Sequence, residues 1–271
     1  MKVTAFFTVF WLSIAAQGQP LAPKKAYAST LLELTDKLLT LQIGREAGTT
    51  CGALTCAHCN VLHTRAAEAV YPFAVAYRIT GRPQYLTGAR HVAEWLIRQQ
   101  EKDGSWKETP EEWTGTTTDQ LLMLLLAYEA LGQDLTKVEQ SKWMCSMHAA
   151  ADYLDRVMSP EFASINYVAT TTATLAKAAE ITGVQRYRQT ARKLAHRTIS
   201  KMDEKGFING EGGRGIGVKL GIDLGYEMEM SLWGLGLYAR ITGDTLVNRK
   251  VRDSLKEHLY FIYPDGSLDN S

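Results

Sequence analysis

Hydrophobic and polar positions along the chain follow the period of an α-helix, and two kinds of helix can be distinguished. The stretch LLMLLLAY at 121–128 is apolar on every side, as expected for a helix that is buried all round. Within 63–80, apolar residues from Val70 to Tyr77 share one face at helical spacing. By contrast, ARHVAEWLIRQQEK at 89–102 carries polar residues along one face. The pattern therefore predicts inner and outer helices.

A repeated phrase follows each predicted inner helix. It reads AYRITGRPQYL, AYEALGQDLTK, AAEITGVQRYR and YARITGDTLVN, the second being a weaker copy. Each phrase contains a glycine that is expected to end the inner helix as a C-cap, before a short turn and an outer helix. These glycines are Gly81, Gly132, Gly183 and Gly243. A repeat of roughly 50 residues without strand signals indicates a series of helical hairpins.

The repeat sets the expected bounds of the helices. Inner helices are predicted near 63–80, 115–131, 163–182 and 223–242. Outer helices are predicted near 26–43, 84–100, 136–157, 186–203 and 245–262. The connections from outer to inner helices are long, and parallel inner helices would place them at one end, where loops usually carry function. The predicted fold class is all-α: an (α/α) toroid, or incomplete α/α barrel, of helical hairpins.

Composition and the N-terminus bear on the domain and its location. The 271 residues are 45% hydrophobic with a formal net charge of +1, which suits a buried core and argues against disorder and against a strongly charged nucleic-acid binder. Met1 and Lys2 precede an apolar run that is short for a bilayer span and ends in small residues. We interpret residues 1–18 as a signal peptide and 19–271 as one toroid domain, secreted or periplasmic, with no membrane span after signal removal.

Four cysteines, Cys51, Cys56, Cys59 and Cys145, leave several interpretations open. Disulfides are expected in an oxidising compartment, with three pairings available, and buried thiols are an alternative. The spacing of the first three is superficially that of a plant-type iron–sulfur loop, but the fourth is distant. A zinc site that uses Cys56, Cys59, His58 or His63 is a further alternative. Apart from that zinc site, no cofactor is expected.

Polar and aromatic residues gather where the predicted inner helices begin. They suit an acidic sugar chain, because aromatic faces stack on pyranose rings, arginine binds a carboxylate through two hydrogen bonds, and parallel helix N-termini favour an anion. The predicted substrate-binding residues are Trp106, Trp113, Asp119, Gln120, Tyr167, Arg214, Asp223 and Glu227. For one acid of the last inner helix, for which we select Glu229, complementing the helix dipole is the simpler explanation.

Three motifs at these helix ends resemble the toroid of heparinase II/III-like polysaccharide lyases. They are HTRAAEAVYPF, DGSWKETPEEWTGTTTDQ and GIDLGYEMEMSLWGLGLYARITGD, within a resemblance that covers residues 50–271. It implies a toroid that is usually followed by an antiparallel β-sandwich. The sequence ends before such a region, so we expect a truncated toroid whose partner is a missing C-terminal region of the same protein.

The resemblance implies β-elimination on uronate-containing glycans. One group must neutralise the uronate carboxylate, while a base removes the C5 proton and an acid assists departure of the C4 oxygen. Because the resembling lyases use Asn, Tyr, His or Arg, we expect Tyr226 to act as base or acid with His63 as its partner. Asn166 and Arg65 would neutralise the carboxylate. The alternative for Tyr226 is a half-buried aromatic with a hydrogen-bonded hydroxyl.

The sequence leaves two other functions open. A glycoside hydrolase on the same toroid would need two carboxyl groups facing each other across the bond, and Asp119, Asp223 and Glu227 are available. The other alternative to the lyase is a non-catalytic sugar-binding toroid or an inactive fragment. For the two enzymes and the binding toroid, the expected partner is an acidic polysaccharide or oligosaccharide and not a nucleic acid.

Overall fold

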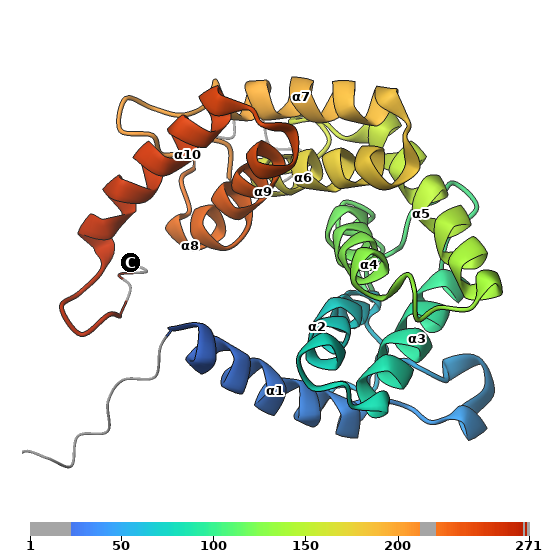
Figure 1. Cartoon of the computed structure of the whole chain (residues 1–271). Coiled ribbons are helices and arrows are strands. Elements are labelled where there is room, and N and C mark those ends of the chain that lie inside the picture. The colour runs from blue at the N-terminus through green and yellow to red at the C-terminus, as the bar shows by residue number, and fades with distance from the viewer. Residues whose placement is uncertain (1–22, 212–220, 268, 270–271) are drawn as a thin grey trace, which may run out of the picture.

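Consecutive helices pair as hairpins that follow one another around an arc (Figure 1). The computed structural model describes residues 23–211, 221–267 and 269. Within these, the inner helices are α2 (Val70–Thr80), α4 (Thr117–Leu131), α6 (Ile165–Thr182) and α9 (Leu232–Thr242). Neighbouring inner helices pack against each other in this order. The predicted inner bounds are confirmed to within a turn, except that two of the predicted helices begin with irregular turns.

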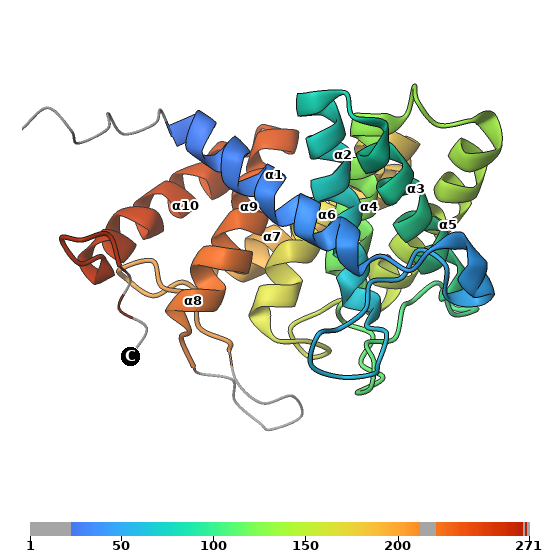
Figure 2. The same cartoon turned by 90° about the horizontal axis from the view of Figure 1, so that it is seen from below.

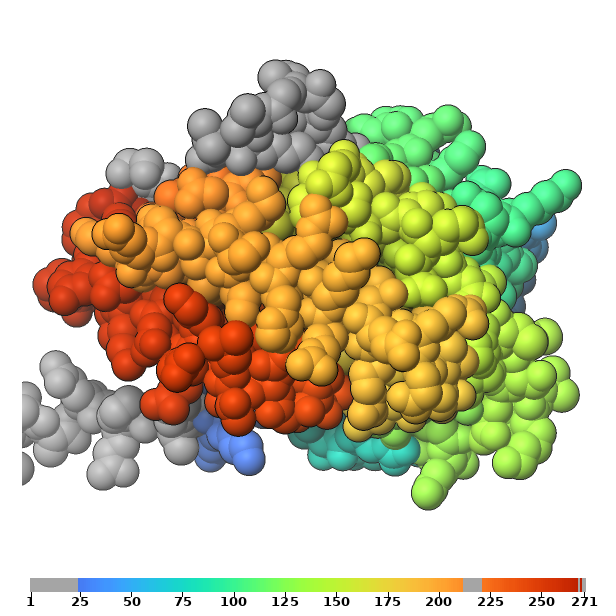
Figure 3. All heavy atoms as spheres, turned by 90° about the horizontal axis from the view of Figure 1, so that it is seen from above, coloured from blue at the N-terminus to red at the C-terminus, as the bar shows by residue number. Residues whose placement is uncertain are grey.

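The outer helices cover the inner ones from outside. They are α1 (Pro23–Leu41), α3 (Pro83–Arg98), α5 (Lys137–Val157), α7 (Gln185–Ile199) and α10 (Thr245–His258). Figure 3 shows α5, α7 and α10 forming one outer face, and Figure 1 shows α1 and α10 at the two ends of the arc. The predicted all-α fold, an incomplete (α/α) toroid, is therefore confirmed.

Short helical turns lead into two of the inner helices. The five short elements are η1 (Arg45–Thr50), η2 (Thr64–Ala69), α8 (Leu224–Tyr226), η3 (Glu227–Ser231) and η4 (Leu259–Phe261). Of these, η2 continues directly into α2, and α8 and η3 continue into α9. The turn η3 is a π-helix, in which the Leu232 N–H donates to the Glu227 carbonyl five residues earlier. Such turns are frequent at functional sites, because they change the direction of side chains within a helix.

Burial separates the two rings, as the sequence pattern predicts. In α6 every side chain from Val168 to Ala179 is buried, whereas α3, α7 and α10 each bury one face. Polar groups between α4 and α6 are paired: Thr118 Oγ1 lies 3.0 Å from Thr174 Oγ1 and accepts from Thr171 Oγ1 at 2.9 Å. Since buried hydroxyls without partners are costly, this pairing lets threonines occupy the core.

Glycines end three of the four inner helices in the predicted manner. Gly81, Gly183 and Gly243 have φ of 68°, 76° and 76°, and each N–H donates to the carbonyl four residues earlier. A side chain is strained in this left-handed region. At the weaker copy of the repeat the prediction is wrong: Gly132 has φ −49°, and α4 ends in a turn where the Asp134 N–H donates to the Leu131 carbonyl.

The long connections lie together at one end of the toroid, as predicted. Figure 2 shows the segments before η2 and before α4, and the described part of the segment before α8, on the same side. We call this side the loop end. Among the described residues, no helix has the length and apolar character to span a membrane. The predicted signal peptide, residues 1–18, lies outside the described part of the chain.

Candidate functional site

Arg65 lies in η2 at the loop end, and three carboxylates surround its guanidinium. Its Nε is 3.2 Å from Glu68 Oε1, its Nη1 is 3.9 Å from Glu108 Oε1, and its Nη2 is 3.6 Å from Asp119 Oδ2. We call these four residues the Arg65 cluster. Glu108 comes from the connection between α3 and α4, and Asp119 from the first turn of α4. The cluster therefore joins the starts of two inner helices.

Three carboxylates of the Arg65 cluster surround its single cation, and two of them, Glu68 and Asp119, have a raised pKa. Burial raises the pKa of Asp119 well above its usual value, and the carboxylates of Glu68, Glu108 and Glu229 raise it further against the opposing effect of Arg65. Burial also raises the pKa of Glu68. Because like charges at short range disfavour joint ionisation, Asp119 is the carboxyl of this cluster best placed to retain a proton.

Aromatic residues connect α6 to the same region. The Trp113 ring stacks on Phe162 with centroids 5.1 Å apart, and Tyr167 meets Trp113 edge-on at 6.1 Å. Burial lowers the pKa of Arg65, but Glu68, Asp119 and, last among these groups, Tyr167 raise it, so Tyr167 lies near the guanidinium. Trp113 and Tyr167 are half-buried, and stacked rings of this kind offer a flat apolar face beside polar groups. The structure thus brings predicted binding residues of α6 and of the connection before α4 close to Arg65.

Asn166, in the first turn of α6, is bonded to the last inner helix. Its backbone N–H donates to Glu211 Oε1 at 3.0 Å, and its Nδ2 donates to the sulfur of Met230 at 3.3 Å. Met230 belongs to η3, and its neighbour Glu229 acts electrostatically on Asp119. The starts of all four inner helices therefore contribute to one region, as the repeat predicts.

Tyr226 ends the short helix α8, and its side chain is 47% exposed. The residue that caps this helix is Asp223, whose Oδ1 accepts from the Tyr226 N–H at 3.0 Å. Asp223 therefore has a structural role, and its predicted contact with substrate stays a prediction. Glu229 lies in the first turn of η3, and its predicted role of complementing the helix dipole also stays a prediction. The partnership of Tyr226 with His63 stays a prediction.

His63 is the N-cap residue of η2, and both of its ring nitrogens have neighbours. Nδ1 lies 2.7 Å from the Thr109 carbonyl oxygen, and Nε2 lies 3.1 Å from Cys59 Sγ. Since a carbonyl oxygen can only accept, Nδ1 carries the proton of the neutral ring and Nε2 offers a lone pair towards Cys59. Cys56, Cys59 and His63 place one ligand atom each within 4.8 Å of one another.

Two predicted binding residues are core residues instead. Trp106 has no exposed surface, and its indole N–H donates to the Leu96 carbonyl at 2.8 Å, so it is no stacking platform. Gln120 is also fully buried, and in the described part of the chain its side-chain amide has no hydrogen-bond partner. The loop before α4 turns Trp106 towards α3, which a linear pattern does not reveal. The predicted Arg214 lies outside the described residues.

Glu227 is likewise buried, in contrast to its predicted contact with substrate. Its Oε1 accepts from the Ile208 N–H at 2.5 Å, and its Oε2 lies 3.2 Å from Nε2 of buried His258 in α10. Burial lowers the pKa of His258, but the two acceptors that face its ring, the Glu227 carboxylate and the Ser254 carbonyl, outweigh burial and raise that pKa overall. The pair ties the last inner helix to its outer neighbour, so Glu227 has a structural role.

Sequence reasoning did not select several residues that the structure places at the site. Glu68 stands three positions after Arg65, the helical spacing at which opposite charges meet, and that signal was available. Glu108 and Glu229 reach the cluster through the loop before α4 and the π-turn, whose directions the sequence does not specify. His258 comes from α10, and its pairing with Glu227 depends on tertiary packing alone.

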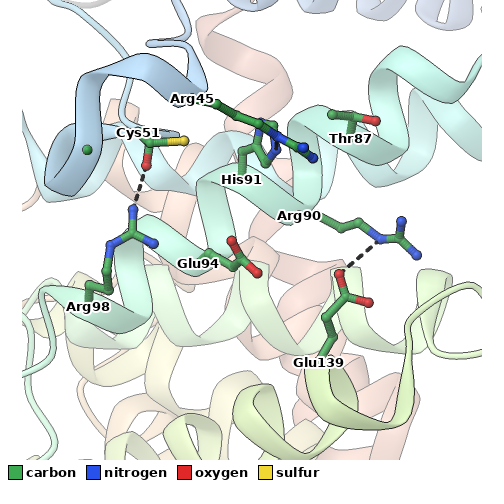
Figure 4. Close-up of a pocket in the computed structure, with 9 residues that line it drawn as sticks. Arg45, Cys51, Thr87, Arg90, His91, Glu94, Arg98 and Glu139 are labelled. Atoms are coloured by element: carbon green, nitrogen blue, oxygen red, sulfur yellow. Dashed lines mark hydrogen bonds and ion pairs between the residues drawn. The ribbon is translucent and has the colours of Figure 1, made fainter.

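A pocket of about 410 Å³ lies elsewhere, between η1, α3 and α5 (Figure 4). Its charged groups are largely engaged: Arg90 pairs with Glu139 at 3.3 Å, and Arg98 donates to the Cys51 carbonyl at 2.6 Å. None of the predicted site residues lines it. We therefore place the candidate site at the Arg65 cluster and not in this pocket.

Solved structures with the same architecture define the class of fold as the (α/α) toroid found in sugar-processing proteins. A sugar epimerase from a ruminal bacterium matches with a TM-score of 0.67 at 11% identity, over 90% of this chain and 74% of that chain. An unsaturated glucuronyl hydrolase from Bacillus sp. GL1 matches with a TM-score of 0.62 at 16% identity, over 88% and 68%. At these identities the likeness shows the fold alone.

Sequence comparison gives the family. Residues 31–271 match the ulvan lyase N-terminal domain, and the chain belongs to that family. A broad-specificity ulvan lyase from Formosa agariphila is 27% identical over 263 residues, which are 93% of this chain and 41% of the relative. The chain thus spans less than half of that relative's length. Membership of a polysaccharide lyase toroid family is confirmed, and the finer resemblance to heparinase II/III-like toroids stays a prediction.

Proposed function

We propose that this chain is the toroid of a secreted or periplasmic polysaccharide lyase that cleaves uronate-containing glycans, of the kind ulvan lyases act on, by β-elimination. The observation that carries the proposal is the Arg65 cluster at the loop end of a chain in the ulvan lyase N-terminal domain family. Because the relative is longer than this chain, the activity is proposed for the whole protein, including a region beyond the toroid. A relationship to heparinase II/III-like toroids would be consistent with β-elimination as well.

Arg65 and Asp119 would neutralise the uronate carboxylate. The Arg65 side chain is 38% exposed, so its guanidinium can contact a ligand. Glu68 and Asp119 lie beside the guanidinium and hold it in position. Asp119, whose raised pKa favours the protonated form, could donate a hydrogen bond beside it. A fixed cation and a proton donor would stabilise the negative charge that develops on the carboxylate when the C5 proton leaves.

Asn166 would assist at the same carboxylate. Its Nδ2 donates only to the Met230 sulfur, which is a weak acceptor, so a substrate oxygen could replace that contact at small cost. Trp113 and Tyr167 would support the sugar ring that carries the carboxylate.

Tyr226 would be the base and the acid of the reaction. As the phenolate, it would take the C5 proton, and the C4–O4 bond would break as the C4–C5 double bond forms. The phenol would then give its proton to the departing O4 and return to the phenolate. Its exposed side chain at the loop end is accessible for this role. We assign no proton transfer to His63, because both of its ring nitrogens already have neighbours.

A hydrolase using the predicted carboxylates has less support. Glu227 is buried against His258, and Asp223 caps α8, so neither is free to face Asp119 across a glycosidic bond. A non-catalytic sugar-binding toroid remains the competing outcome of the test below.

The test uses the whole protein with ulvan as the probe. A lyase produces new reducing ends together with ultraviolet absorbance from an unsaturated uronate, whereas a hydrolase produces reducing ends alone and a binding protein produces neither. Tyr226→Phe is expected to abolish elimination while the fold is kept. The matched control is Tyr260→Phe, which alters a tyrosine that is 83% exposed in η4 and should leave the rate unchanged. Equal rates for the two variants would remove Tyr226 from the mechanism.

A further inference from the structure

Two thiols and an imidazole converge on the loop that precedes η2. The ligand atoms of Cys56, Cys59 and His63 all lie within 4.8 Å of one another, and Cys59 Sγ is 3.1 Å from His63 Nε2. Cys59 is exposed and the other two residues are half-buried, so the group can be reached from solution. We propose that Cys56, Cys59 and His63 bind one Zn²⁺ ion. This proposal does not depend on the proposed function.

The spacing of the three atoms fits a tetrahedral ion after a small adjustment. With zinc bond lengths of about 2.3 Å to sulfur and about 2.0–2.1 Å to nitrogen, ligand atoms around a tetrahedral ion lie about 3.5–3.8 Å apart. The Cys59–His63 separation of 3.1 Å would open slightly, and the other two separations, both within 4.8 Å, are already near that range. Two thiolates with one imidazole are a donor set that favours zinc over magnesium or calcium.

The surroundings of the three side chains are those of metal ligands. The Thr109 carbonyl accepts from His63 Nδ1 at 2.7 Å, which fixes the ring and directs the Nε2 lone pair towards Cys59. A second contact of this type is usual for histidines that bind metals. The His58 N–H donates to Cys56 Sγ at 3.4 Å, which helps to hold the sulfur in place. His58 itself would contribute this backbone group, and its exposed side chain is not part of the ligand group.

The loop that carries the ligands is already attached to the connection before α4. Thr64 Oγ1 donates to the Lys107 carbonyl at 2.7 Å, and Thr109 Oγ1 donates to the Leu62 carbonyl at 2.8 Å. The ion would therefore close a loop whose far end leads directly into η2 and Arg65. Three protein ligands leave one tetrahedral position for water, an arrangement known for zinc sites that are open to solvent. Cys51 lies outside the group, which argues against an iron–sulfur loop.

The test measures metal content and not activity. Untagged full-length protein, dialysed against metal-free buffer and analysed by plasma mass spectrometry, is expected to retain about one zinc per chain. Cys56→Ser, Cys59→Ser and His63→Ala should each weaken Zn²⁺ binding by at least about tenfold. The matched controls are Cys51→Ser and Cys145→Ser, which remove free thiols outside the group and should leave the zinc content unchanged.

Substitution with Co²⁺ adds a spectroscopic readout. The cobalt protein should show the thiolate-to-metal charge-transfer band and the visible bands of tetrahedral cobalt, and Cys59→Ser should weaken the former. Zinc content that is equal in Cys59→Ser and Cys145→Ser would overturn the proposal. A Cys56–Cys59 disulfide, found by mass spectrometry in protein that holds no metal before or after reduction, would also overturn it.

Discussion

Arg65 Nη2 lies 3.6 Å from Asp119 Oδ2, which joins the turn before α2 to the first turn of α4. The two residues come from successive repeats of the chain. Their contact follows from parallel inner helices that begin at the same end, and it sets a partly exposed cation beside a buried acid.

Asp119→Asn is expected to stabilise the fold at neutral pH. The pKa of Asp119 is raised in the folded state, so the folded chain binds this proton more tightly than the unfolded chain, where the pKa is about 3.9. Stability therefore falls as pH rises above about 4, and asparagine, which imitates the protonated acid, avoids that loss. At pH 7 the variant should melt a few degrees higher, at about 2–4 °C per kcal/mol.

Thermal unfolding followed at pH 4 and at pH 7 checks this prediction. The advantage of Asp119→Asn should shrink towards pH 4, because the wild-type acid is then protonated in the folded state and about half protonated in the unfolded state, where its pKa is about 3.9. Asp253→Asn, at an exposed position in α10, serves as the control and should alter Tm little at either pH. A lower Tm for Asp119→Asn at pH 7 would show that the ion pair with Arg65 outweighs burial.

His258→Gln is expected to remove a pH-dependent part of the stability. The pKa of His258 is raised in the folded state, so its contribution is fully present below about pH 6.5 and is lost as pH rises through the folded pKa. Removing the charged partner of buried Glu227 should cost up to about 3–5 kcal/mol below that pH. Urea unfolding between about pH 6 and 9 measures the slope.

The control for this prediction is His148→Gln, at a half-buried position of α5. It should keep the wild-type slope of stability against pH, while His258→Gln flattens it. If all three proteins lose stability in parallel as pH rises, the Glu227–His258 pair is not the source of the dependence.

Gly234→Ala is expected to destabilise the contact between α9 and α6. A Cβ atom at Gly234 would lie 2.8 Å from the Ala169 carbonyl oxygen and 2.8 Å from Thr170 Cα, both backbone atoms that cannot move aside alone. Overpacking of this kind costs about 1–3 kcal/mol. Gly236, two residues further on, has only Val251 Cγ1 within 4 Å of such an atom, at 3.8 Å.

Gly236→Ala is therefore the matched control and should be neutral or stabilise by about 0.5–1 kcal/mol, since alanine favours a helix. Chemical unfolding of both variants gives the comparison. Equal stabilities would mean that α9 can shift away from α6 without penalty.

The sequence was sufficient to predict the helices because the local pattern determines them. All-round apolar stretches and repeated glycines set the inner helices and their ends, and only Gly132, in the weaker copy, departs from the expected cap. The position of the long connections at one end could also be predicted, because the repeated hairpins make the inner helices parallel.

Side-chain directions at the site were harder to predict. The sequence places Glu227 and Glu229 on the same turn, but the π-turn and the later helix α10 bury Glu227 against His258 and leave Glu229 to act on Asp119. Trp106 similarly precedes an inner helix, yet its loop directs it into the core. Such directions depend on contacts between distant segments, which periodicity does not encode.

The central claim is that Arg65 neutralises a uronate carboxylate during elimination. The direct measurement is the rate at which the whole protein carrying Arg65→Gln forms unsaturated uronate from ulvan, beside Arg240→Gln in the last turn of α9, away from the loop end. Both variants are first shown by thermal unfolding to be folded. The account predicts that Arg65→Gln lowers kcat/KM by about 10²–10³, whereas Arg240→Gln keeps the wild-type value. A folded Arg65→Gln protein as active as Arg240→Gln would contradict it.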